Sequence, residues 1–172
     1  MEKVIFEADA MNRSLKRIAH EILEKNLDIE KVVLVGIKTR GVFLANRLSA
    51  LIQQFEGVEV PAMELDVRAY RDDEKRDSEA KSGQSDVELE DKIVILVDDV
   101  LYTGRTIRAA MEAVLEYGRP KRMQLATLID RGHRELPIRA DYVGKNIPTS
   151  GKEKVSVFLS EVDGKDVIYI TN

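Results

Sequence analysis

The segment with the greatest capacity for chemistry is a 13-residue run that ends at Thr106. It begins with apolar residues, reaches two adjacent carboxylates at Asp98 and Asp99, and continues into a turn that holds Gly104. Backbone N–H groups at such a turn, and at the start of a helix after it, bind anions with help from the helix dipole. Glycine also lets the backbone approach a phosphate closely. The pattern therefore predicts a phosphate site beside two carboxylates.

The two aspartates need a different ligand, because they would repel a phosphate placed directly against them. A few residues before the turn, they can accept hydrogen bonds from sugar hydroxyls or hold a hydrated Mg²⁺. A phosphorylated ribose fits this pairing of donors and acceptors. Taken alone, Asp98 and Asp99 are also typical of a magnesium-holding pair in a P-loop enzyme, or of a helix cap. The chain has no Gly-x-x-x-x-Gly-Lys-Ser/Thr, which removes the P-loop interpretation, and no Gly-x-Gly-x-x-Gly to support a dinucleotide site.

Alternating helices and strands must position these residues. Apolar residues at helical spacing predict helices over residues 9–26, 42–54 and about 106–117. Asp9 is a candidate cap of the first helix. Runs rich in β-branched residues predict strands over residues 31–36, 60–70, 93–97, 124–129, 155–159 and 167–170. Because helices separate the strands, we predict an α/β fold with a mainly parallel sheet flanked by helices, whose ligand site lies beyond the carboxyl ends of the strands.

Length and composition limit the class of protein. The chain has 172 residues, of which 44% are hydrophobic and 34% charged, and this suits one domain with a buried core. The absence of cysteine excludes disulfides, thiolate metal sites and a catalytic thiol. No apolar run approaches the ~20 residues of a membrane helix, and the first residues lack the apolar segment of a signal peptide. We therefore expect a single domain over residues 1–172, located in the cytoplasm.

Charge is distributed unevenly along the chain. The net charge of −4 by itself argues against nucleic-acid binding. However, residues 56–99 hold 15 acidic and 6 basic side chains, whereas residues 119–154 hold 9 basic and 4 acidic ones. Between about residues 71 and 91 the chain is almost free of apolar side chains. A loop of this length is usually functional or disordered, and we expect a flexible loop there, which a mobile lid, a hairpin tip or a solvated loop would all explain.

These segments together resemble the type I phosphoribosyltransferases. Residues 94–106 resemble the phosphoribosyl pyrophosphate motif of that family. The particular likeness is to the bifunctional group that attenuates pyrimidine operons and acts as uracil phosphoribosyltransferase. It extends over nearly the whole chain through residues 35–41, 70–73, 130–142 and 144–150. The resemblance implies the family's fold, in which a small hood region accompanies the parallel sheet.

The resemblance also implies a reaction and a set of site residues. Uracil and phosphoribosyl pyrophosphate would give UMP and pyrophosphate, with Mg²⁺ and no tightly bound organic cofactor. Asp98, Asp99 and Arg40 would be catalytic, and the two aspartates would also hold the metal indirectly. A guanidinium suits pyrophosphate because its fork of donors matches phosphate oxygens. The expected substrate-binding residues are Thr39, Arg40, Arg71, Val100, Leu101, Tyr102, Thr103, Gly104, Arg105, Thr106, Arg131 and Val155.

Basic residues form two further groups, one on the first predicted helix and one between residues 133 and 145. A solvated surface of mixed charge explains either group. The resemblance instead implies that they bind a hairpin in the messenger RNA of the pyrimidine operon, more tightly when a uridine nucleotide occupies the active site. The RNA-binding residues would be Arg17, His20, Lys25, Arg134, Arg139 and Lys145. Lys16 and Lys25 stand where relatives carry a small hydroxyl residue and an arginine, and both are compatible with phosphate contact.

Two matters stay open at the level of sequence. The alternative function is a purine phosphoribosyltransferase with no role in RNA binding. Relatives form dimers, and some of these pair into tetramers, so we expect a homodimer or a homotetramer.

Overall fold

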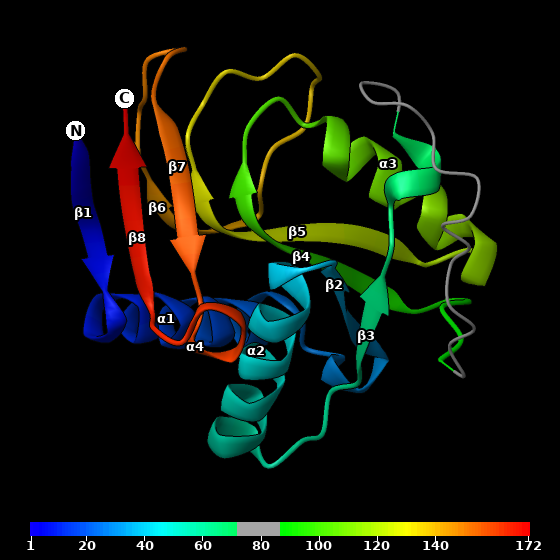
Figure 1. Ribbon diagram of the computed structural model, residues 1–172. Helices are drawn as coiled ribbons and strands as arrows, with labels where there is room; N and C mark the ends of the chain where they lie inside the picture. The colour runs from blue at the N-terminus through cyan, green and yellow to red at the C-terminus, as the bar shows by residue number, and fades with distance from the viewer. Residues whose placement is uncertain (72–86) are drawn as a thin grey trace.

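The computed structural model describes residues 1–71 and 87–172. Its centre is a five-stranded parallel sheet with the strand order β3-β2-β4-β5-β6 (Figure 1). The strands of this sheet are β2 (Val32–Ile37), β3 (Ala62–Leu65), β4 (Ile93–Leu101), β5 (Arg122–Asp130) and β6 (Tyr142–Asn146). The predicted α/β fold with a mainly parallel sheet is confirmed.

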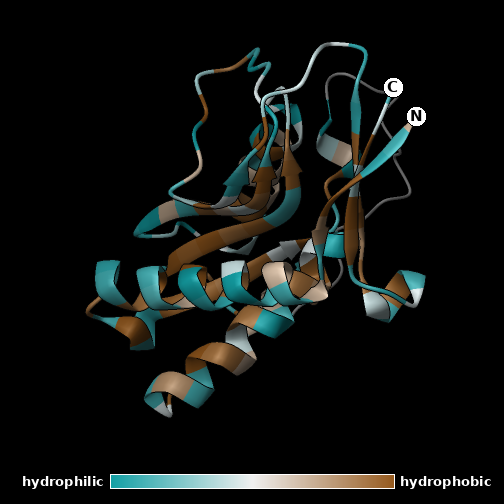
Figure 2. Cartoon of the chain, turned by 90° about the vertical axis from the view of Figure 1, so that its left-hand side faces the viewer, coloured by the Kyte–Doolittle hydropathy of each residue, from teal (hydrophilic) through white to brown (hydrophobic). Residues whose placement is uncertain are grey.

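Helices cover both faces of this sheet, and the burial pattern of the strands explains why. Successive side chains of a strand point to opposite faces. In β2, Val32 and Leu34 join the core under α1 (Ala8–Lys25) and α2 (Arg40–Glu56), whereas Val33 and Val35 join the core under α3 (Arg105–Val114). Figure 2 shows the hydrophobic colours concentrated on the strands of the sheet. Burial on both faces is why these strands read as continuous apolar runs. Short 3₁₀ helices occupy Ile29–Lys31, Arg68–Tyr70 and Leu115–Tyr117.

Two glycines set α2 tightly against the sheet. A Cβ on Gly41 would lie 2.3 Å from the carbonyl oxygen of Val97, and one on Gly36 would lie 2.5 Å from the carbonyl oxygen of Gly41. No side chain fits at these distances, so the first turn of α2 can approach β2 and β4 only if both residues are glycine. The close approach brings the turn before α2 next to the aspartates of β4.

A small antiparallel sheet with the order β1-β8-β7 forms the hood region. Its elements are β1 (Glu2–Glu7), β7 (Lys154–Phe158), the short helix α4 (Ser160–Asp163) and β8 (Val167–Thr171). Glu2 pairs with Thr171, so the two ends of the chain lie side by side (Figures 1 and 2). The expected hood region is confirmed.

The predicted strand over residues 60–70 is wrong in length. The strand β3 ends at Leu65, because the carboxylate of Asp66 turns back to accept hydrogen bonds from the backbone N–H and the guanidinium of Arg68. The strand predicted over residues 93–97 is too short instead. It continues to Leu101, which pairs with Asp130 of β5, so the two aspartates lie within β4 rather than after it.

Two local expectations also need correction or fall outside the structure. Asp9 is not a cap, because α1 begins at Ala8 after Glu7, and Asp9 lies in the first turn, where its charge still suits the helix dipole. The strands β1 and β6 were not predicted.

Most of the expected flexible loop, residues 72–86, lies outside the described residues. Within the described ranges, no helix has the length and apolar character that crossing a membrane requires.

Candidate functional site

The loops that follow three parallel strands meet at the carboxyl edge of the sheet. They are the turn after β2, the segment after β3 and the turn between β4 and α3. A cavity of about 380 Å³ lies among them, lined by Lys38, Thr39, Asp66, Val67, Arg68, Arg71 and Thr106. Thr39, Arg71 and Thr106, which are far apart in the sequence, are thereby brought together as predicted site residues.

The carboxylates of Asp98 and Asp99 are fixed by the backbone of their own strand. Asp98 Oδ1 accepts the N–H of Asp99 at 2.9 Å, and Asp99 Oδ1 accepts the N–H of Val100 at 2.8 Å. Burial and the adjacent charge of Asp99 raise the pKa of Asp98 well above its ordinary value. The charge of Arg71 acts on the pKa of Asp98 in the opposite direction, which puts both residues in one site. A crowded pair of carboxylates of this kind favours hydroxyl or cation ligands.

The turn before α3 has the backbone geometry of an anion site. Gly104 has a φ of 95°, in the left-handed region that favours glycine, and it is the residue that precedes α3. Thr103 Oγ1 accepts the N–H of Arg105 at 3.3 Å. The carbonyl oxygen of Thr103 accepts the N–H groups of Glu135 at 2.9 Å and Leu136 at 3.3 Å. The turn is therefore braced by residues 135–136 while the helix N-terminus stays directed at the site.

The turn between β2 and α2 carries the predicted pyrophosphate residues. Thr39 precedes α2, Arg40 opens it, and the peptide bond between Lys38 and Thr39 is cis. Arg40 Nη2 donates to Asp163 Oδ1 at 2.8 Å. Arg40 Nε is buried and has no hydrogen-bond partner within residues 1–71 and 87–172. This guanidinium therefore retains donors for an anionic ligand.

Arg131 joins the loops after β4, β5 and β6. Its Nε donates to Thr149 Oγ1 at 3.1 Å, and its Nη2 donates to the carbonyl oxygen of Glu153. The ring of Tyr102 lies on its guanidinium, with a distance of 4.0 Å from Cζ to the ring centroid. Val155 is buried in β7, two residues after Glu153. Arg131 therefore contacts the segment that leads into β7, the strand that carries Val155.

Three of the predicted RNA-binding residues lie where α1 packs on β6. Arg17 donates to the carbonyl oxygens of Val143 and Gly144 in β6. Lys25 pairs with the carboxylate of Asp141 at 3.2 Å, just before the same strand. Lys145 belongs to β6 itself, is exposed, and has its Nζ 5.0 Å from the centroid of the Phe6 ring. The two basic groups of the sequence therefore meet on one surface, which we call the α1–β6 surface.

The other three RNA-binding candidates have different surroundings. His20 is exposed on α1 and stacks on Phe55 of α2, with ring centroids 4.1 Å apart. Arg139 is exposed in the loop before β6. Arg134 donates to the carbonyl oxygens of Tyr102 and Ile138 and to the carboxylate of Asp130, so its guanidinium holds its own loop together. Its proposed part in RNA binding stays a prediction.

Sequence reasoning missed Asp66 and Arg68, which line the cavity. Their ion pair has an Nη2–Oδ2 distance of 2.7 Å, and the hydrogen bonds from Arg68 lower the pKa of Asp66. Both residues were overlooked because the predicted strand over residues 60–70 included them. An aspartate two residues before an arginine, directly after a short apolar run, indicates a turn, and this pattern could have identified both residues.

The acidic side chains also bear on the expected magnesium ion. In the part of the chain that the structure describes, no three His, Cys, Asp or Glu side chains form a group that could hold a metal. Asp98 and Asp99 alone fit a Mg²⁺ that keeps several waters and takes further oxygens from a phosphorylated substrate.

Comparisons with known proteins agree with this geometry. A family model described as the phosphoribosyl transferase domain matches residues 3–163. A bifunctional protein PyrR of Pediococcus pentosaceus is 53% identical over the full length of both chains. One of Enterococcus faecalis is 56% identical over 99% of this chain and 97% of that protein. A pyrimidine operon regulatory protein of Lactococcus lactis subsp. lactis is 55% identical over 98% of this chain and 96% of that protein.

Solved structures are similar at lower sequence identity. A hypoxanthine phosphoribosyltransferase of Trypanosoma cruzi superposes with a TM-score of 0.75 at 19% identity, covering 98% of this chain and 95% of that one. The corresponding enzyme of Staphylococcus aureus gives 0.74 at 22% identity, covering 96% and 89%. At these identities the likeness shows the fold alone.

Proposed function

This chain belongs to the phosphoribosyl transferase family, and from that premise we propose that it transfers phosphoribose from phosphoribosyl pyrophosphate to uracil. Relatives at 53–56% identity over almost the full length are bifunctional proteins or pyrimidine operon regulators. The chain is accordingly a pyrimidine operon regulator that carries a phosphoribosyltransferase domain. A purine base as the acceptor has support only from structures at about 20% identity, which carry no information about the substrate.

One observation carries the catalytic part of the proposal. The turn after β2, the carboxylates of β4 and the turn before α3 converge on a single edge of the sheet, around the cavity that Thr39, Arg71 and Thr106 line. A phosphorylated ribose with a pyrophosphate leaving group needs two anion sites, with groups between them that accept hydrogen bonds from the ribose hydroxyls. At this edge the turns before α2 and α3 are the two anion sites, and the carboxylates of β4 are the acceptors.

The reaction needs no covalent nucleophile from the protein. As the bond from the anomeric carbon to pyrophosphate breaks, a ring nitrogen of uracil bonds to that carbon, and the pyrophosphate departs with the electron pair. The proton that this nitrogen carried is released to solvent. Positive charge develops on the ribose and negative charge on the leaving group. Asp98 and Asp99 accept hydrogen bonds from the ribose hydroxyls and stabilise the positive charge on the ribose. Arg40 and the N–H groups of the turn before α2 stabilise the departing pyrophosphate anion. Arg131 and Val155 border the uracil.

The remaining substrate contacts follow the same loops. Of the predicted residues 100–106, those in the turn and at the start of α3 hold the 5′-phosphate through backbone N–H groups and the hydroxyls of Thr103 and Thr106. Arg71 adds a positive charge on the other side of the cavity. Mg²⁺, held indirectly by Asp98 and Asp99, would supply further charge neutralisation of the pyrophosphate when bound.

The regulatory part of the proposal is supported by the α1–β6 surface. Arg17, Lys25 and Lys145 converge there from two distant parts of the chain. We assign this surface, together with His20, Arg134 and Arg139, to a hairpin of the pyrimidine operon leader. A protein that reads nascent messenger RNA acts in the cytoplasm. We further propose that it assembles as a homodimer or homotetramer.

A side-by-side assay of the acceptor base tests the catalytic proposal. Wild-type protein is incubated with phosphoribosyl pyrophosphate, Mg²⁺ and one of uracil, hypoxanthine, guanine or adenine, and nucleotide formation is measured. We expect UMP from uracil, with the purine bases giving at most a hundredth of that rate. Preferred use of a purine, or no nucleotide from any base, would contradict the proposal.

A further inference from the structure

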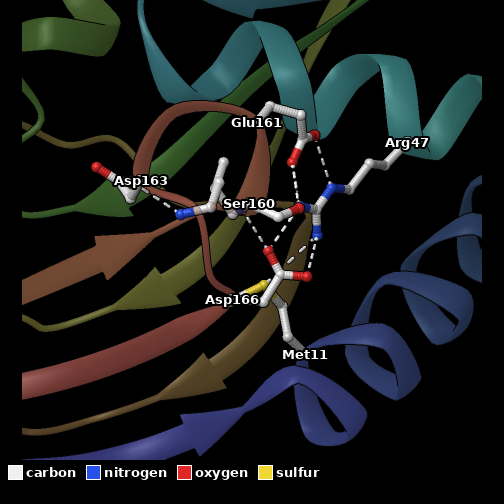
Figure 3. A network of polar contacts seen from close by, with 7 residues as sticks. Met11, Arg47, Ser160, Glu161, Asp163 and Asp166 are labelled. Carbon is white, nitrogen blue, oxygen red and sulfur yellow. Dashed lines mark hydrogen bonds and ion pairs between the residues drawn. The ribbon is translucent and has the colours of Figure 1, made fainter.

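The hood is fastened to α2 by two arginines of that helix. Arg47 donates to Asp166 at 2.7 and 3.1 Å, to Glu161 Oε2 at 2.9 Å and to Ser160 Oγ at 3.2 Å (Figure 3). Arg40, two turns earlier on α2, donates to Asp163 of the same hood helix, α4. Arg47 is not among the residues that line the cavity, whereas Arg40 directly follows Thr39, which does line it.

A backbone hydrogen bond holds the carboxylate of Asp163 in the position from which it contacts Arg40. Its Oδ2 accepts the N–H of Leu159 at 2.9 Å, so the carboxylate is fixed by the backbone at the start of α4 (Figure 3). Its Oδ1 is thereby directed to Arg40 Nη2 at 2.8 Å. The side chain of Asp163 is 15% exposed and that of Arg40 31% exposed, so solvent screens this pair only in part. The Leu159 N–H and then the Arg40 guanidinium lower the pKa of Asp163, and the carboxylate is charged at neutral pH.

We propose that Asp163 is a positioning residue that fixes the guanidinium of Arg40 for the pyrophosphate group. This inference rests on the proposed function and adds to it a residue from the hood. Arginine has a long side chain with many rotamers, and the contact at Nη2 restricts them while it uses only one of five N–H donors. The buried Nε has no partner in residues 1–71 and 87–172, so within them no other acceptor orients that edge of the guanidinium.

The contact also makes the pyrophosphate turn depend on the hood. The strand β7, which carries Val155, leads directly into α4, and α4 ends at Asp163. The wall beside the proposed uracil position and the residue that fixes Arg40 therefore belong to one short stretch of chain. Binding of pyrophosphate should therefore respond to a change at Asp163 of α4 that leaves the nucleotide site intact.

Asp163→Asn separates positioning from folding. The asparagine has nearly the same shape, but its amide offers one acceptor where the carboxylate offers two. Either the N–H of Leu159 or the guanidinium of Arg40 must then face an NH₂ donor. Glu161→Gln is the matched control, because it alters another carboxylate of α4 that contacts Arg47 rather than Arg40.

Calorimetry with Mg²⁺-pyrophosphate, and separately with UMP, gives the decisive readouts, since UMP does not use the pyrophosphate subsite. We expect Asp163→Asn to weaken pyrophosphate binding about tenfold, which is ~1.4 kcal/mol, with UMP binding within twofold of wild type. Glu161→Gln should leave both within twofold. In Arg40→Lys, adding Asp163→Asn should cause little further loss, because Asp163 acts through Arg40.

Three results would overturn the inference. They are unchanged or tighter pyrophosphate binding by Asp163→Asn, equal loss of pyrophosphate and UMP binding, and a full independent loss in the Arg40→Lys background. In each of these three cases the wild-type protein still binds UMP and pyrophosphate. Failure of the proposed function is distinguishable, because wild-type protein would then form no UMP from uracil or would prefer a purine base.

Discussion

The two adjacent aspartates of β4 each lead to a separate prediction. Asp99→Asn should lower the turnover of UMP formation at least a hundredfold, because it removes a carboxylate that favours the positive charge on the ribose. The fold should stay intact, since an asparagine Oδ1 can still accept the N–H of Val100. Steady-state kinetics with circular dichroism checks both points.

Asp91→Asn is the matched control for that variant. Asp91 lies just before the same strand, has a φ of 58° that asparagine tolerates, and forms a surface ion pair with Lys31. Turnover should stay within twofold of wild type. Near-normal turnover in Asp99→Asn would remove this residue from the mechanism.

Asp98 should be costly to the stability of the ligand-free protein. Burial and the charge of Asp99 disfavour its ionised form in the folded state. Asp98→Asn should therefore raise the unfolding free energy at pH 7 by about 1 kcal/mol or more while it lowers activity, as expected where function conflicts with stability. Urea unfolding without ligand measures this. A destabilised Asp98→Asn protein would show that the carboxylate is well accommodated.

The chemistry-bearing residues were easier to predict than their partners. Asp98 to Thr106 are contiguous, so the order of residue types alone indicated a phosphate site. Asp163 could not be found in this way, because its importance comes from a contact with Arg40, 123 residues away in the chain. Asp66 and Arg68 were hidden by a strand predicted too long, since residues 60–70 alternate well enough to imitate one.

At the scale of elements, the attachment of α4 to α2 should make stability depend on pH. Hydrogen bonds from Arg47 lower the pKa of Glu161. Although burial acts to raise the pKa of Asp166, the hydrogen bonds from Arg47 and Ser160 outweigh this effect, and the pKa of Asp166 is lowered as well. Groups with a lowered folded-state pKa stabilise the protein above their unfolded values of about 4, and this contribution is lost as the pH falls through the folded values.

The pH prediction can be isolated with a single variant. Glu161→Gln should cost about 1 kcal/mol at pH 7, a figure that allows for partial exposure of the pair. The gap between wild type and variant should close as the pH falls from 5 to 3. Thermal unfolding across this range measures the gap, and a constant difference would contradict the assigned role of the carboxylate.

The α1–β6 surface makes a prediction about salt. Lys145→Gln should weaken binding of the leader hairpin and reduce the slope of log K against log salt by about 0.7–0.9, the effect of one lost phosphate contact. Lys121→Gln, which removes a lysine paired with Asp28, should change neither quantity. A filter-binding titration over several salt concentrations decides the matter. An unaltered slope in Lys145→Gln would exclude a phosphate contact there.

Element prediction succeeded where burial on two faces left a continuous apolar run, as in β2 and the first part of β4. It failed for β6, which contains Gly144, Lys145 and Asn146, and for β1, which begins and ends with charged residues. These strands lie at sheet edges, so their side chains need not be apolar. The strand β1 pairs with β8 at the other end of the chain, and no local pattern encodes that pairing.

For the whole molecule, the net charge of −4 conceals an uneven distribution of charge, because acidic and basic segments of the chain lie toward different edges of the parallel sheet. Within the described residues, the acidic stretch supplies β3 at one edge of the sheet and the first part of β4 at its centre, whereas the basic stretch of residues 119–154 supplies β5 and β6 toward the other edge. α1 packs on β6 and adds Arg17 and Lys25 to the basic side. Cationic side chains from two parts of the chain, of which Arg17 pairs with Glu21 and Lys25 with Asp141, thus gather on one side of a domain whose net charge is negative.

The same scaffold gives a physical link between the two activities. The carbonyl oxygen of Thr103, in the predicted phosphate turn, accepts the N–H groups of Glu135 and Leu136. These residues lie in the loop that carries Arg134 and Arg139. We therefore propose that a nucleotide which orders the turn acts on the loop through these two hydrogen bonds.

The most direct test of this combined account is the affinity of the protein for its pyrimidine-operon leader hairpin, measured by gel shift with and without UMP at low salt. The account predicts a specific complex that tightens when UMP is present. Absence of binding with UMP present, or equal affinity with and without it, would contradict the claim that one domain joins catalysis to regulation.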